Sequence, residues 1–132
     1  MVFRRILRPA AAGAILFFGL AAAPMQRDAA ALSRIEHGKW QLKQPDGTAR
    51  TQCMAAPSAW VQIRHPGLQC QQVVISGQGD KVTMGYNCPG HGNGQTTISV
   101  ETPRLVRVET SGVVDGAPFQ DEYEARKIGP CG

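Results

Sequence analysis

The sequence has no Cys-x-x-Cys pair and no Gly-x-Ser-x-Gly motif. The first absence argues against a thiol oxidoreductase and against attached haem, because both use closely spaced cysteines. The second argues against a serine hydrolase whose nucleophile lies on that turn. The four cysteines, Cys53, Cys70, Cys88 and Cys131, are too widely separated for the usual zinc-ligand spacing. We therefore predict no metal, no cofactor and no catalytic residue, and a protein that is not an enzyme.

The charged residues show no large excess of one sign once the first 31 residues are set aside. The remainder has ten Lys or Arg and nine Asp or Glu residues, a net charge of +1, whereas the whole chain carries +4. A nucleic-acid-binding domain usually carries clustered basic residues on its folded surface. We therefore predict no nucleic-acid partner.

The chain has only one long apolar run, residues 10–23, and it is shorter than the roughly 20 residues that a membrane-spanning helix needs. Three arginines precede the run, as in a secretory signal. We predict a signal peptide over residues 1–31, cleaved between residues 23 and 31, and one domain over residues 32–132. No cysteine lies near the cleavage zone, so we expect no stable membrane anchor after cleavage. The protein is expected to be periplasmic or secreted.

Short alternating runs separated by turn residues dominate the predicted domain. Residues 82–88 are typical, because Val82, Met84 and Tyr86 alternate with smaller or polar residues. Residues 73–75 form a contiguous β-branched run, which favours a strand covered on both faces. The fold class predicted is all-β, mainly antiparallel, with about seven strands in a meander that forms a sandwich or an open barrel. Expected strands cover residues 39–43, 48–54, 71–76, 82–88, 95–101, 104–111 and 119–128.

Only one helix is predicted, over residues 57–63, with Pro57 at its start. Residues 89–94 are rich in glycine and are predicted to form a flexible loop. A phosphate-binding role for this loop is not supported, because no Lys-Ser/Thr pair follows it and a strand is expected next.

An even number of cysteines in a small exported domain predicts two disulfides. If the turn at residues 77–80 joins two antiparallel strands, Cys70 lies opposite Cys88. Cys53 would then pair with Cys131. The sequence also allows Cys53–Cys70 with Cys88–Cys131, and we favour the first arrangement because of the hairpin geometry.

The histidines and carboxylates show no catalytic grouping. The three histidines are isolated in expected loops, where surface positions are more common than metal ligation: His37, His65 and His91. In a strand, Asp121 faces away from Glu122 and Glu124, so these carboxylates are expected on solvated surfaces and not in an acid–base pair.

Gly38-Lys39-Trp40 opens the first predicted strand, and Arg126 lies on the last. This combination resembles the barrel-closing pair of lipocalin-like proteins. The alternative is a core tryptophan covered by the aliphatic stem of the arginine. Both interpretations give Gly38, Trp40 and Arg126 structural roles, and we assign a structural role to Gly129 in the terminal segment as well.

The ordered set Gly38-x-Trp40, Cys53-Met54, Cys70, Cys88 and Ile128-Gly129-Pro130-Cys131 covers nearly the whole predicted domain. It resembles a family of small exported bacterial proteins catalogued as domain of unknown function 3617. The resemblance implies a periplasmic protein of a family without an established activity. It implies no catalytic residues.

These observations predict a non-enzymatic β domain that binds a small molecule or an envelope protein, and that is a monomer. Three alternatives remain open: a lipocalin-like carrier of a small apolar molecule, a protein binder that acts like a protease inhibitor, and a small hydrolase using His91 or the acids near Asp121. An enclosed apolar cavity would favour the carrier. A filled interior with an exposed apolar patch would favour the protein binder.

Overall fold

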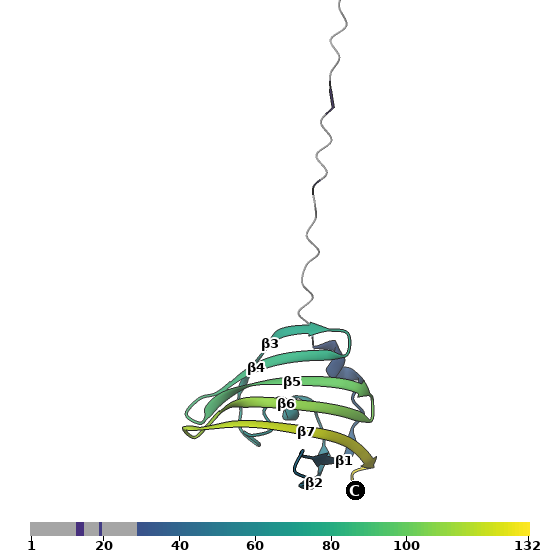
Figure 1. Ribbon diagram of the computed structural model, residues 1–132, viewed down its shortest axis with the longest axis vertical. Helices are drawn as coiled ribbons and strands as arrows, with labels where there is room; N and C mark the ends of the chain where they lie inside the picture. Colours follow the sequence, from purple (N-terminus) through teal and green to yellow (C-terminus); the bar gives the residue numbers. More distant parts are fainter. Residues whose placement is uncertain (1–12, 15–18, 20–28) are drawn as a thin grey trace, which may run out of the picture.

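The computed structural model describes residues 13, 14, 19 and 29–132, so the predicted signal segment lies almost entirely outside the described residues. Within the described part, seven strands form one antiparallel sheet in the order β2-β1-β7-β6-β5-β4-β3 (Figure 1). The elements are η1 (Ala30–Arg34), β1 (Gly38–Lys43), β2 (Ala49–Met54), α1 (Ser58–Val61), β3 (Gln71–Gln78), β4 (Lys81–Cys88), β5 (Gly92–Thr102), β6 (Leu105–Val114) and β7 (Ala117–Gly129).

The sheet is a meander with one added hairpin. Strands β3 to β7 follow one another, and the β1–β2 hairpin joins the free side of β7. Figure 1 shows the curved sheet with β3 at the top and the β1–β2 hairpin at the bottom. The two edge strands, β2 and β3, do not pair with each other, so the barrel is open. The predicted all-β, mainly antiparallel meander of about seven strands is confirmed.

One face of the sheet, called the inner face here, is buried against α1. Trp40 of β1 and Trp60 of α1 are both fully buried, and their rings meet edge to face with centroids 4.9 Å apart. The helix begins after Pro57, as predicted. Side chains on the outer face alternate with these and are mostly polar. The helix therefore fills the concave side of the open barrel.

Both disulfides of the favoured arrangement are present, Cys70–Cys88 and Cys53–Cys131, with Cα atoms 4.3 Å and 5.8 Å apart. The alternative pairing is wrong. The predicted hairpin register is confirmed, because Val74 is opposite Met84. The turn is shorter than predicted, because β3 extends to Gln78 and β4 begins at Lys81. The bulge at Ile75 adds one residue to β3, and this extra residue restores the predicted pairing of Val74 with Met84.

The segment Ala30–Arg34 forms a short 3-10 helix, η1, in which Ala31 is buried. This helix crosses the predicted domain boundary at residue 32, which stays a prediction. One local prediction is wrong. The loop at residues 89–94 is shorter than predicted, because β5 already begins at Gly92. A side chain at Gly92 would overlap the carbonyl group of Val113, so glycine is needed for the close approach of two strands and not for a flexible loop.

Candidate functional site

Four residues were predicted to have structural roles: Gly38, Trp40, Arg126 and Gly129. Gly38 and Gly129 lie side by side, whereas Trp40 and Arg126 lie on opposite faces of the sheet. Trp40 is in the core and its indole Nε1 donates a hydrogen bond to the carbonyl of Glu36 at 3.1 Å. Arg126 lies on the outer face and pairs with Glu124 at 3.3 Å. Lys127 is the residue opposite Trp40 in the register. Neither the lipocalin-like pair nor the alternative of a tryptophan covered by the arginine stem forms. Arg126 is one residue away from the residue opposite Trp40 in β7, and neighbouring residues in a strand point to opposite faces.

Gly38 and Gly129 mark the point where β1 begins beside the end of β7. Gly38 has φ +149°, and a Cβ there would lie 2.7 Å from the carbonyl oxygen of Gly129. The backbones can approach this closely only because residue 38 has no side chain. Gly129 itself has no atom within 4 Å of such a position, so only Gly38 is sterically required.

His65 is buried, which contradicts the prediction of a surface histidine. Its Nε2 lies 3.0 Å from the carbonyl oxygen of His91, and its Nδ1 lies 3.0 Å from the hydroxyl of Tyr86. Since a carbonyl can only accept, Nε2–H donates, and in the neutral imidazole Nδ1 accepts from the Tyr86 hydroxyl. Burial raises the pKa of Tyr86, so this donor stays protonated at neutral pH. The imidazole therefore links the segment after α1 to β4 and to the β4–β5 turn.

A second buried hydrogen-bond chain holds α1 in place. The hydroxyl of Thr96 donates to the carbonyl of Val61 at 2.5 Å, and the hydroxyl of Thr110 lies 2.8 Å from that of Thr96. Both threonines are on the inner face and are nearly fully buried. Both hydroxyl groups already take part in hydrogen bonds, so neither threonine is a candidate catalytic residue.

The side chains considered for a hydrolase are separated. His91 and Asp115 approach to 3.3 Å at the protein surface, where both are more than half exposed. Asp121 lies on the inner face and forms an ion pair with Arg64, whereas Glu122 is on the outer face. The predicted division of these acids between the faces of β7 is confirmed.

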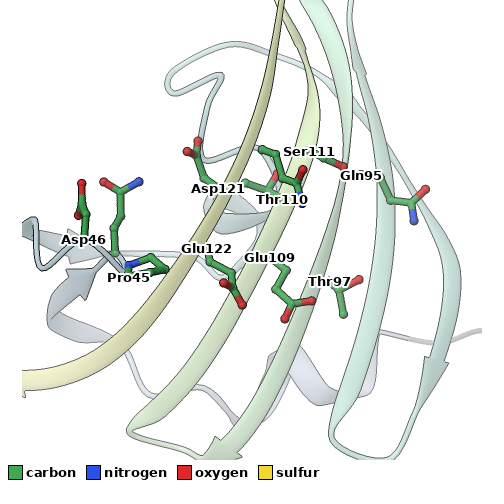
Figure 2. A pocket seen from close by; sticks show the side chains of 11 residues that line it. Pro45, Asp46, Gln95, Thr97, Glu109, Thr110, Ser111, Asp121 and Glu122 are labelled. Carbon is green, nitrogen blue, oxygen red and sulfur yellow. The ribbon is translucent and has the colours of Figure 1, made fainter.

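A surface recess of about 750 Å³ lies beside the tip of the β1–β2 hairpin and the middle of β5, β6 and β7 (Figure 2). Glu109 and Glu122 are opposite each other in neighbouring strands, and Figure 2 shows their carboxylates projecting beside one another. Within the described residues no group of three or more His, Cys, Asp or Glu side chains is suited to hold a metal ion. This recess is polar and open, and it is not a carrier cavity for an apolar molecule.

Strand β3 carries two of the three large hydrophobic side chains that are exposed among the described residues. Val73 is 62% exposed and Ile75 is 42% exposed, so the prediction of a strand covered on both faces is wrong. Both side chains lie over Gly85 on the outer face, with Ile75 Cδ1 only 3.2 Å from an ideal Cβ position there. The β-branched side chains of this run cover the glycine, and the bulge lies at Ile75. The sequence could not predict this exposure, because a β-branched run is equally typical of a central, buried strand.

The two disulfides are typical of proteins from oxidising compartments. No helix in the described part of the chain is long and apolar enough to cross a membrane. Comparison with known proteins finds no matching family model, curated protein or solved structure.

Proposed function

We propose that this protein is an exported, non-enzymatic domain that binds a partner protein by strand addition at the β3 edge. The observation that supports this most directly is the exposure of Val73 and Ile75 on an edge strand. Strand addition supplies affinity through main-chain hydrogen bonds and specificity through the side chains of alternate residues.

The composition of β3 makes its edge unusually receptive. None of its eight residues, Gln71–Gln78, is charged, and none is proline. Natural proteins commonly protect exposed edges with charged residues, prolines, bulges or very short strands. Of these devices β3 has only the bulge, next to Ile75. The opposite edge strand, β2, is shorter and carries Arg50. The β3 edge is therefore the better candidate for an interface.

The filled interior supports a protein partner over an apolar cargo. The concave side of the sheet is occupied by Trp40, Trp60 and the aliphatic core residues around them. A lipocalin-like carrier would need an enclosed apolar cavity in this place. The separation of Asp121 from its neighbouring acids likewise gives no support to hydrolysis.

Export to the periplasm or the cell exterior is part of the proposal. The basic and apolar N-terminal segment predicts a signal peptide. The two disulfides are consistent with that destination. Membership of the exported family named above stays a prediction.

A photo-crosslinking amino acid at Gln71 tests the interface in the producing cell. We expect it to form an adduct with another envelope or secreted protein, whereas the same group at Gln95, which is exposed in the central strand β5, should not. The captured protein is then purified and titrated. Ile75→Lys should weaken binding at least about tenfold, because a charge is placed on the apolar contact. Gln95→Lys is the matched control.

Adducts of equal strength from both positions would contradict the proposal, as would unchanged binding by folded Ile75→Lys protein. An adduct formed only with a second copy of the chain would also contradict it, because the β3 edge would then mediate self-association and not binding of another protein. Thermal unfolding of both lysine variants shows whether each is folded before its binding is measured.

A further inference from the structure

Two arginines border one recess in the open seam between β2 and the segment that follows α1. The recess has a volume of about 390 Å³, and its lining includes Leu42, Arg50, Ile63, Arg64, Pro66 and Tyr123. Its apolar wall comes from β1, from the end of the α1 region and from the buried ring of Tyr123. The strands that line it, β1, β2 and β7, are at the other end of the strand order from β3. The volume is within the range of small-ligand sites.

Arg64 is held in place by two contacts. Its guanidinium forms an ion pair with the Asp121 carboxylate and lies 5.0 Å from the centroid of the Phe119 ring. Asp121 is mostly buried, with a side chain that is 15% exposed. The charge of Arg64 is therefore largely balanced within the protein.

The charge of Arg50 is not balanced in this way. Its guanidinium lies 5.7 Å from the centroid of the Tyr123 ring, and no carboxylate of the described residues forms an ion pair with it. The nearby carboxylate of Asp46 lines the neighbouring recess and accepts a hydrogen bond from the backbone N–H of Thr48 at 2.8 Å. The recess thus has one cation available beside an aromatic ring.

Tyr123 supplies the other polar group at the base of the recess. Burial is the main cause that raises the pKa of Tyr123, and the charge of Asp121 raises it further. The phenol is therefore protonated at neutral pH and can donate a hydrogen bond. A cation, a phenolic donor and an apolar wall together match an ionised carboxylate attached to an apolar group.

We propose that this recess binds a small organic carboxylate with an apolar body. Arg50 pairs with the carboxylate, and Leu42, Ile63 and Pro66 contact the apolar part. Two sources share this chemistry, a free organic acid and the C-terminal carboxylate of a peptide that ends in an apolar residue. The inference does not depend on the interface proposed at β3.

Calorimetric titration of the folded, oxidised protein with 3-phenylpropionate tests the site, with 3-phenylpropionamide as the neutral analogue. We expect the acid to bind with a dissociation constant of about 1 mM or tighter and the amide at least about tenfold more weakly. Arg50→Gln should weaken binding of the acid by a similar factor. Arg104→Gln removes an exposed arginine from the β5–β6 turn and should change nothing.

The same titration with acetyl-Ala-Phe, as its free acid and as its amide, separates the two sources. Tighter binding of the peptide acid than of 3-phenylpropionate identifies a chain terminus as the ligand, and the reverse order identifies a free acid. Equal binding of acids and amides would overturn the proposal. So would an Arg50→Gln protein that binds like the wild type, or amide NMR shifts that fall away from Arg50, Ile63 and Tyr123.

Discussion

At the scale of single residues, glycines mark the places where two backbones, or a backbone and a ring, must come very close. The Tyr86 ring lies over Gly94, where a Cβ would be 2.6 Å from its atoms. An aromatic ring placed over a glycine in a neighbouring strand protects the exposed backbone. Gly38 serves the contact between β1 and β7 in the same way. Substitution at such positions therefore tests the packing of the sheet and not the flexibility of a loop.

We expect Gly38→Ala to lower the free energy of unfolding by about 1–3 kcal/mol, because it combines positive φ with a clash against the Gly129 carbonyl. Gly129→Ala is the matched control, since space around that position is open, and its effect should be within about 0.5–1 kcal/mol. Urea unfolding of both variants measures the difference. Equal losses would show that the close approach at Gly38 relaxes without cost.

At the scale of elements, η1 contributes to the fold although it contains only five residues. Ala31 and Ile35 both enter the core, and Arg34 forms an ion pair with Asp80 at 2.6 Å. The ion pair is exposed, so it contributes little, and apolar burial dominates. This places residues at the end of the predicted signal segment inside the folded domain.

A chain beginning at residue 32 should therefore be less stable than one beginning at residue 24, by about 1 kcal/mol for the lost burial of Ala31. Chemical denaturation compares the two. The same reasoning predicts that signal cleavage occurs before Ala29, near the early end of the interval between residues 23 and 31. N-terminal sequencing of the exported protein checks this, and a mature chain that starts at Leu32 would contradict it.

At the scale of the whole molecule, the disulfides compensate for an open barrel. Cys53–Cys131 connects the edge strand β2 to the end of the chain beyond β7, so it spans β1. Cys70–Cys88 joins the hairpin at the other edge. Each therefore holds one edge of a sheet that cannot be closed by strand pairing.

Replacing Cys53 and Cys131 by alanine should destabilise the protein more than replacing Cys70 and Cys88. The sequence separations are 78 and 18 residues, which correspond to loop-closure contributions of about 4.5 and about 3 kcal/mol. Denaturant unfolding measures both variants. Repeating it with reduced protein isolates the loss of packing at buried Cys88, because no crosslink is then present. A reversed order in oxidised protein would contradict the loop-closure argument.

The sequence by itself was sufficient for the features that depend on neighbours along the chain. The turn predicted at residues 77–80 led to the Cys70–Cys88 pair, although the actual turn is shorter and the bulge at Ile75 restores the register. Alternation in β4 predicted its buried face, and Pro57 predicted where α1 begins. These features arise from local backbone preferences and from a period of two residues, which are independent of the remaining fold.

Only the tertiary structure decided which side chains meet over long separations. Arg64 and Asp121 are 57 residues apart in the sequence, and no local pattern indicates their ion pair. Nor does one indicate Arg50 beside them, which has no ion-pair partner in the described part of the chain. His65 occupies an expected loop but is buried by Tyr86 and the β4–β5 turn. The β-branched run in β3 became exposed because that strand is at the sheet edge. Strand order and curvature determine these outcomes, because they set which surfaces are covered.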